Sequence, residues 1–283
     1  MIDQLTILAP GLLGGSVARA ARARNAARRI VIWARRPEVR KALARQPWCD
    51  EVAGTAEAAV ETADLVIVAA TVDAIAPLVR QIAGALPKGA VVTDVGSAKG
   101  EIAREGHAAL SPRAHFVGSH PMAGSEKTGW ENGSAGLFQS RTCFVTPLPK
   151  TDARAVRVVT GFWRKLGAKV AKVAPDEHDR IVAHISHLPQ ILASSLCSFL
   201  DEKDPAWLKY AGGGLRDTTR IAGSDPALWR TIIAQNRDEI RRALRQYQFE
   251  LVAYESAIAK GDWEGLLELM SRGRACRGRL PEL

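Results

Sequence analysis

Short, continuous apolar runs alternate with helical patterns through the first part of this 283-residue chain. The apolar runs lie at residues 4–8, 29–34, 64–70 and 90–95. The helical patterns lie at residues 14–25, 37–46, 55–62, 73–86 and 99–110. Strands that are apolar throughout are typical of a parallel sheet covered on both faces, and their alternation with helices indicates βαβ units. We therefore expect an α/β fold built on a parallel sheet.

The pattern changes near residue 174. Before it, three further runs are expected to add edge strands to the sheet, at residues 116–118, 143–147 and 168–173. After it, no convincing strand occurs, and helices are expected at residues 176–201, 205–214, 226–258 and 262–274. We therefore expect two domains, an α/β domain over 1–174 and an all-helical domain over 175–283.

The net charge of +9 is concentrated in one segment. Residues 19–45 hold ten basic side chains and one acidic side chain, so the rest of the chain is balanced. We interpret this segment as a solvated face of arginine-rich helices, with a contribution to binding a phosphorylated ligand as the alternative. Trp33 is the only aromatic residue in this segment, which argues against aromatic side chains stacking on nucleic-acid bases. We expect no nucleic-acid partner.

The four cysteines are widely scattered, with neither a CxxC pair nor a cluster with histidine. They fit neither a disulfide framework nor a structural metal site, so no metal is expected and a reducing compartment is indicated. No apolar run reaches about 18 residues, and the N-terminus lacks the pattern of a secretory signal. We expect a cytoplasmic protein that does not span a membrane.

A glycine-rich turn at residues 9–16 (Ala-Pro-Gly-Leu-Leu-Gly-Gly-Ser) follows the first apolar run and opens a helix. In this context the pattern predicts a Rossmann-type dinucleotide site; the alternative is a purely structural turn. Gly11 would let the backbone approach a pyrophosphate at the helix N-terminus, and Gly14 would allow close helix–strand packing. Ala9 replaces the first glycine, which a tight turn tolerates if its φ stays negative. The expected cofactor contacts are Gly11, Leu12, Leu13, Gly14, Ser16, Ala70 and Ser97.

Two arginines follow the second apolar run, where an NAD site usually places an acidic residue. Arg35 and Arg36 match the charge and geometry of a ribose 2′-phosphate. We therefore expect NADP, with NAD less favoured. The alternative is that both arginines belong to the exposed basic face.

Three segments carry polar groups where an α/β scaffold would place a site: residues 94–99, 116–129 and 176–190. The second puts His120 at a strand end before a glycine-rich loop. In the third, Asp179, His187 and Gln190 fall within one stripe of a regular helix, together with Ala183. Taken alone, His120 is as well explained by capping or packing.

In these residues the chain resembles the TyrA-type prephenate and arogenate dehydrogenases over nearly its whole length. The matching motifs are the turn 11–16, Asp94–Lys99, the Gly-Ser-His-Pro-Met-Ala-Gly-Ser-Glu loop 118–126, residues 178–179 with 186–189, and residues 214–222. The resemblance implies a Rossmann-type dinucleotide-binding domain followed by an all-helical dimerisation domain. It also implies a homodimer and oxidative decarboxylation of a cyclohexadienol in tyrosine biosynthesis.

The implied reaction needs a proton acceptor at the substrate hydroxyl and cations at its carboxylates. The resemblance places His120 in the first role, where general-base catalysis typically contributes about 10²–10⁴-fold. Ser97 would hydrogen-bond the same hydroxyl or orient the imidazole. Arg220 would grip a carboxylate bidentately. Asp179 and His187 would line the substrate site.

Glu126 would pair with Lys99 or a nearby arginine at the pocket mouth, or form a plain surface ion pair. Trp229 would lie at the edge of the site, or pack in the core. Gln190 stands where many prephenate-using relatives carry histidine. A neutral amide accepts a hydrogen bond from the ammonium of arogenate, whereas an imidazolium would repel it. We therefore expect arogenate as the favoured substrate.

Several alternatives stay open: a cyclohexadienyl dehydrogenase using both substrates, a prephenate-specific enzyme, and a non-catalytic NADP-sensing regulator. A β-hydroxyacid dehydrogenase would resemble this domain arrangement. Its site is built around a catalytic lysine on a helix, and the combination of His120 and Arg220 argues against it.

Overall fold

The computed structural model describes residues 2–124 and 127–281. The chain divides into two compact units, Met1–Asn236 and Arg237–Leu283. The first unit contains the sheets and helices α1 to α10, and the second contains a pair of helices.

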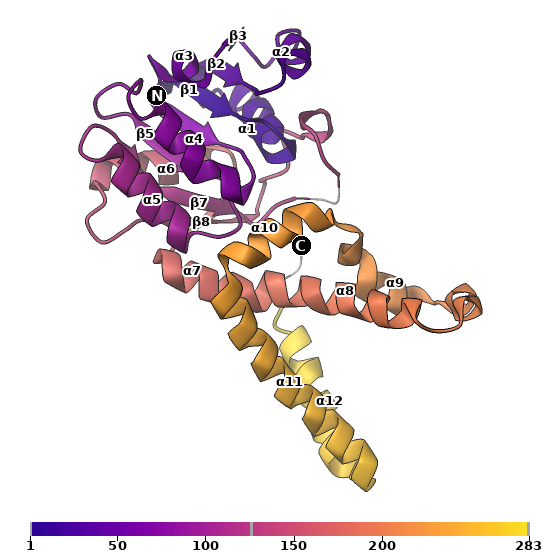
Figure 1. Cartoon of the computed structure of the whole chain (residues 1–283). Helices are drawn as coiled ribbons and strands as arrows, with labels where there is room; N and C mark the ends of the chain where they lie inside the picture. The colour runs from indigo at the N-terminus through magenta and orange to yellow at the C-terminus, as the bar shows by residue number, and fades with distance from the viewer. Residues whose placement is uncertain (1, 125–126, 282–283) are drawn as a thin grey trace. The chain divides into compact units, whose positions relative to one another are not determined.

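The first unit is built on a six-stranded parallel sheet, as the alternating pattern predicts (Figure 1). Its strands are β1 (Ile2–Leu8), β2 (Ala27–Trp33), β3 (Glu51–Val52), β4 (Leu65–Val68), β5 (Val91–Asp94) and β6 (His115–Phe116). The spatial order β3-β2-β1-β4-β5-β6 is that of a Rossmann sheet, and the strand order reverses between β1 and β4. The two-residue strand β3 is too short to have a periodic signal and was not expected.

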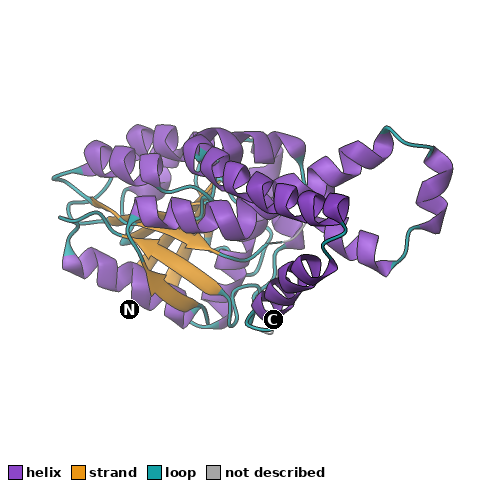
Figure 2. Ribbon diagram, turned by 90° about the horizontal axis from the view of Figure 1, so that it is seen from below, coloured by secondary structure: helices purple, strands orange, loops and turns teal. Residues whose placement is uncertain are grey.

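Helices cover both faces of this sheet, and Figure 2 shows the strands between them. Helices α1 (Leu12–Ala23) and α6 (Ala153–Lys165) contribute to the core on one face. Helices α3 (Ala56–Val60), α4 (Val72–Ile82) and α5 (Gly100–Leu110) contribute to the core on the other. Helix α2 (Pro37–Leu43) follows β2. Helix α6 was not expected, although it is strongly amphipathic and the side chain of Asp152 caps its N-terminus by accepting from the amide of Ala155.

A second, three-stranded sheet corrects the expectation of additional edge strands. Strand β7 (Gly118–Pro121) pairs antiparallel with β8 (Thr142–Thr146), and β8 pairs parallel with β9 (Lys169–Lys172). The expected run 116–118 is split, because β6 ends the first sheet at Phe116 and β7 opens the second at Gly118. Strand β7 carries His120 opposite Phe144.

The rest of the first unit is helical. Its helices are α7 (Pro175–Val182), α8 (Leu188–Asp201), α9 (Gly213–Thr219) and α10 (Pro226–Gln235). A π-helical turn, Ala183–His187, joins α7 to α8, and 3₁₀ turns occur at Trp130–Asn132, Pro205–Tyr210 and Arg220–Gly223.

The second unit is the helix pair α11 (Arg237–Lys260) and α12 (Trp263–Arg277). The expected single helix over 226–258 was therefore wrong, because the chain breaks at Asn236 between α10 and α11. The helix pair turns at Gly261, whose φ of 66° favours glycine, and Arg272 bonds Glu250 at 3.1 Å. Among the described residues, no helix combines the length and apolarity needed to cross a bilayer.

Candidate active site

The glycine-rich turn lies between the carboxyl end of β1 and the start of α1, beside the point where the strand order reverses. Parallel α/β sheets form their ligand crevices at this position. A Cβ placed on Gly11 would meet no atom within 4 Å, so the backbone there is open to approach. A Cβ on Gly14 would lie 2.8 Å from the Cβ of Ala69, so only a glycine at position 14 lets α1 pack this closely against the residue after β4.

The expectation of a negative φ at Ala9 was wrong. Its φ is 55°, in the left-handed region that disfavours side chains with a Cβ. The amide of Ala9 donates to the carbonyl of Trp33 at 2.8 Å, which ties this conformation to the neighbouring strand β2. The departure from the glycine pattern therefore stores strain in the turn instead of avoiding it.

The other expected cofactor contacts differ in accessibility. Leu12 and Leu13 begin α1 and are half-buried, as is Ala70 just beyond β4. Ser16 is fully buried. Its hydroxyl donates to the carbonyl of Leu12 at 2.8 Å and accepts from the amide of Ser134 at 3.0 Å. The side chain of Ser16 therefore ties the turn to a later loop.

Arg35 and Arg36 are both exposed at the carboxyl end of β2. Arg36 lies 3.7 Å from Glu38, whereas Arg35 makes no ion pair with the part of the chain that the structure describes. Arg40 donates to the carbonyls of Ala34 and Arg35 at 2.8 and 3.0 Å, so a third arginine positions the backbone of this turn. The turn therefore presents an unpaired guanidinium to solvent.

A buried ion pair supports the strand that carries His120. Lys99 and Asp94 are both fully buried and bonded to each other through their charged groups. Asp94 also accepts from the amides of Gly96 at 2.8 Å and Ser119 at 3.1 Å. Ser119 in turn donates its hydroxyl to the carbonyl of Asp94. Strand β7 is thereby fixed against the carboxyl end of β5.

His120 lies at the end of a chain of hydrogen bonds. Its Nδ1 lies 2.9 Å from Nε2 of His178, and Nδ1 of His178 lies 2.8 Å from Oδ1 of Asp179. Asp179 also accepts from the amides of Lys99 and Gly100, each at 2.7 Å, at the N-terminus of α5. Negative charge is stabilised at a helix N-terminus.

The charge of Asp179 sets the tautomers along this chain. Burial raises the pKa of Asp179, but the hydrogen bonds from His178 and from the two amides outweigh it, so the pKa lies below its usual value. An ionised carboxylate only accepts, so His178 carries its proton on Nδ1 and accepts at Nε2. His120 must then carry its proton on Nδ1. Its Nε2 is left as a proton acceptor.

Burial lowers the pKa of both imidazoles. Burial, followed by the charges of His178, Lys99 and His187, holds the pKa of His120 well below its usual value. The pKa of His178 is also lowered, because burial outweighs its hydrogen bond to Asp179. His120 is 7% exposed and therefore neutral at physiological pH, as a general base must be.

His187 is fully buried, and its two ring nitrogens have different surroundings. The amide nitrogen of Asn236 donates to the carbonyl of Asp179 at 2.8 Å and lies 3.2 Å from Nδ1 of His187. Nδ1 therefore accepts, so the proton is on Nε2, which faces the backbone of Ser97 without a hydrogen bond of good geometry in the described part of the chain. Burial lowers the pKa of His187 to about 4. The ring of Trp229 packs edge-on at 5.9 Å.

Gln190 connects α8 to the segment that holds Arg220. Its Nε2 donates to the carbonyl of Ile221 at 3.0 Å and to the hydroxyl of Ser194 at 3.3 Å. This orientation leaves its Oε1 as an acceptor. Arg220 is exposed next to Ile221, and the structure places it in no contact with His120 among the described residues.

One expectation about pairing needs correction. Ser97 is half-buried and makes no hydrogen bond to His120 in the described part of the chain; the orienting partner of His120 is His178. Glu126 lies outside the described residues, so its expected pairing with Lys99 or an arginine stays a prediction.

Sequence reasoning gave no role to three residues that organise the site. His178 and Asp94 lie in motifs that the sequence analysis quoted, but only their contacts reveal what they do. Asn236 lies outside those motifs, and only its contacts reveal its role. The π-helical turn between α7 and α8 also departs from the regular helix used to group Asp179 with His187.

Comparison with known proteins identifies the family. Residues 17–172 match the model of the prephenate dehydrogenase nucleotide-binding domain, and residues 174–272 match that of the prephenate dehydrogenase dimerization domain. The cyclohexadienyl dehydrogenase of Zymomonas mobilis is 30% identical over 282 residues, covering 98% of this chain and 96% of that protein.

Two solved structures are similar over almost their whole length. Prephenate dehydrogenase from A. aeolicus, in complex with hydroxyphenyl propionate and NAD+, has a TM-score of 0.92 at 29% identity, covering 99% of both chains. Synechocystis arogenate dehydrogenase has a TM-score of 0.85 at 26% identity, covering 98% of this chain and 99% of that one. The chain therefore belongs to the prephenate dehydrogenase family of oxidoreductases.

Proposed function

We propose that this protein catalyses the NADP-preferring oxidative decarboxylation of arogenate to tyrosine, with His120 as the general base. The observation that carries the proposal is the relay from Asp179 through His178, which leaves Nε2 of a neutral, nearly buried His120 as a proton acceptor. A bound dinucleotide supplies the hydride acceptor. The residues of this chain must then take the hydroxyl proton and hold the carboxylates.

The relay matches what the proton transfer requires. As hydride leaves the carbinol carbon, the hydroxyl proton moves to Nε2 of His120. The resulting imidazolium donates through Nδ1 to His178, which is held by the ionised Asp179. The ring carboxylate then leaves as CO₂, and its bonding electrons make the ring aromatic and move onto the ketone oxygen. That oxygen takes the proton back from His120, which gives the phenol and restores the neutral imidazole. Ser97, half-buried after β5, is proposed to bond the same hydroxyl.

Arg220 is proposed to bind a substrate carboxylate, since a guanidinium stays charged and binds carboxylates bidentately. His187 is proposed to line the substrate site, with the ring of Trp229 beside it. Gln190 favours arogenate, because its Nε2 is held by Ile221 and its Oε1 remains free to accept from an ammonium. Glu126 is proposed to lie at the mouth of the site.

The dinucleotide is proposed to bind at the turn of Gly11, Leu12, Leu13 and Gly14, close to Ala70. The open space at Gly11 and the tight packing of Gly14 fit a pyrophosphate at the N-terminus of α1. The exposed, unpaired Arg35, with Arg36 beside it, supports a 2′-phosphate and hence NADP. NAD+ in the A. aeolicus structure makes NAD the natural competitor.

We further propose a homodimer. Several large apolar side chains of the second unit are exposed, notably Phe249, Val252, Ile258, Trp263 and Met270. The match of residues 174–272 to a dimerization domain supports a second copy of this chain as their cover. The division into domains at residue 174 remains a proposal. So does the cytoplasmic location, which the four free cysteines support.

Four initial-rate assays test the substrate and cofactor, crossing arogenate and prephenate with NAD+ and NADP+. We expect the highest kcat/KM with arogenate and NADP+. A higher value with NAD+ would refute the role of Arg35 and Arg36, and a higher value with prephenate would refute that of Gln190. Comparable values with both substrates would indicate a cyclohexadienyl dehydrogenase, which the Zymomonas mobilis relative favours. No turnover in any assay would favour the NADP-sensing regulator.

A further inference from the structure

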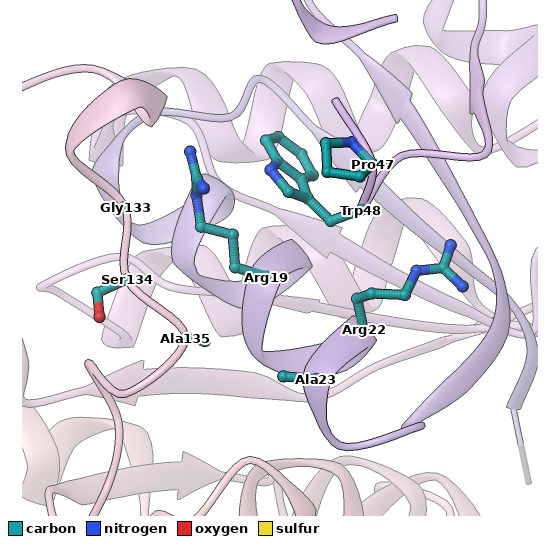
Figure 3. Close-up of a pocket in the computed structure, with 8 residues that line it drawn as sticks. All are labelled: Arg19, Arg22, Ala23, Pro47, Trp48, Gly133, Ser134 and Ala135. Atoms are coloured by element: carbon teal, nitrogen blue, oxygen red, sulfur yellow. The ribbon is translucent and has the colours of Figure 1, made fainter. Parts of the chain in front are cut away.

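The basic segment 19–45 contributes to a pocket that the proposed reaction does not use. The pocket has a volume of about 360 Å³ (Figure 3). It is lined by Arg19, Arg22, Ala23, Pro47, Trp48, Gly133, Ser134 and Ala135. These residues come from the second half of α1, the loop before β3 and the loop after Trp130.

Three hydrogen-bond donors of this pocket have no partner. The Nε atoms of Arg19 and Arg22 and the indole Nε1 of Trp48 are buried and unbonded within the part of the chain that the structure describes. Trp48 is 5% exposed, so its N–H is not available to bulk solvent. A buried donor without a partner costs about 1–3 kcal/mol, so three such donors beside one pocket mark it as a candidate binding site.

The charge of the pocket is positive. Arg22 is paired with Asp50, which lies outside the lining. Arg19 makes no ion pair with any described residue, and its guanidinium carbon lies 5.1 Å from the ring centre of Trp48. Figure 3 shows the side chains of Arg19 and Trp48 next to each other. An unpaired guanidinium with free N–H groups is suited to binding a carboxylate or phosphate.

The wall opposite Trp48 is held firmly against α1. A Cβ on Gly15 would lie 2.8 Å from the carbonyl oxygen of Trp130, and one on Gly133 would lie 2.9 Å from the backbone of Gly15. The amide of Ser134 donates to Ser16. Close backbone contact of this kind makes the pocket pre-organised, which lowers the cost of binding.

The pocket shares no lining residue with the dinucleotide turn at residues 9–16. Its loop at Gly133 and Ser134 contacts α1 at Gly15 and Ser16, whereas the lining residues Arg19, Arg22 and Ala23 lie further along that helix. The pocket therefore lies beside the second half of α1, away from the helix N-terminus where the dinucleotide is proposed to bind.

We propose that this pocket is a second ligand site, which binds a small molecule through a carboxylate or phosphate group held by Arg19 and the indole N–H of Trp48. Inorganic phosphate and benzoate are the probes, and each is titrated calorimetrically at constant ionic strength. The variants are Arg19→Gln, Trp48→Phe and, outside the pocket, Arg28→Gln and Arg35→Gln. Arg28 is the matched control, because it is an exposed arginine of the same basic segment, paired with Asp3.

We expect at least one probe to bind saturably at a site that depends on Arg19, and the probe that binds there identifies the anionic group. Arg19→Gln should weaken binding about tenfold or more, and Trp48→Phe about three- to tenfold, because each removes a donor to a charged group. Arg28→Gln and Arg35→Gln should each bind within about twofold of the wild type. A thermal melt of each variant checks that it is folded.

The proposal is overturned if neither probe binds saturably to the wild-type protein. It is equally overturned if Arg28→Gln weakens binding as much as Arg19→Gln, which would indicate general charge attraction. Loss of binding in Arg35→Gln but not in Arg19→Gln would place the anion at the dinucleotide turn. None of these results depends on turnover, so failure here is distinguishable from failure of the proposed reaction.

Discussion

The buried His187 predicts a specific loss of stability in acid. Its pKa is about 4 in the folded protein, whereas the pKa of an imidazole in the unfolded chain is near its usual value of 6.5. The unfolded chain therefore binds more protons as the pH falls below 6.5, and the free energy of unfolding decreases until the pH reaches about 4. Between pH 7 and pH 5, the titration of His187 alone should lower the free energy of unfolding by about 2 kcal/mol.

The variant His187→Asn isolates this contribution, because it keeps a side-chain amide at the position but no longer titrates. The free energy of unfolding is measured by urea denaturation at pH 7 and pH 5, at one protein concentration, since a dimer makes stability concentration-dependent. The pH-dependent contributions of His120 and His178 to the free energy of unfolding are the same in both proteins and cancel in the comparison. The wild type should lose about 2 kcal/mol more than the variant. Equal losses would show that His187 titrates normally and is not held neutral by burial.

Three further substitutions test the supports of the site. Asp179→Asn should lower kcat about 10²-fold or more and alter its pH profile, with KM for the dinucleotide nearly unchanged, because an amide cannot fix the His178 tautomer; an unchanged pH profile would contradict the relay. Lys99→Met should lower the free energy of unfolding in urea by about 3–5 kcal/mol, because it leaves Asp94 charged, buried and without its cation. A loss below about 1 kcal/mol would refute the pairing. Gly14→Ala should cost about 1–3 kcal/mol, because its Cβ would lie 2.8 Å from Ala69; unchanged thermal stability would contradict that packing.

Local patterns were enough to predict the parallel sheet, because each of its longer strands is a continuous apolar run between amphipathic helices. They were not enough for the second sheet. The short segments at β7, β8 and β9 carry no pattern that assigns them to a separate sheet, and only pairing between distant residues separates the two sheets. Strand β3 is set by its pairing with β2 and has no pattern of its own.

The candidate site shows the same limit. The position of His120 before a glycine-rich loop was predictable, but its partner was not, because His178 lies 58 residues later and is brought to it by α7. Likewise, Lys99 pairs with Asp94 five residues earlier, and no sequence pattern predicted this buried ion pair. A sequence reveals which residues are able to ionise, but burial and distant contacts decide which of them pair.

The proton acceptor at His120 is the claim on which the account depends, and the most direct measurement is kcat of His120→Asn against the wild type. The assay uses the better of arogenate and prephenate with its preferred dinucleotide, and dinucleotide binding is measured separately. The account predicts a loss of about 10³-fold or more in kcat with the dinucleotide affinity unchanged. A variant that keeps kcat within about tenfold of the wild type would contradict it.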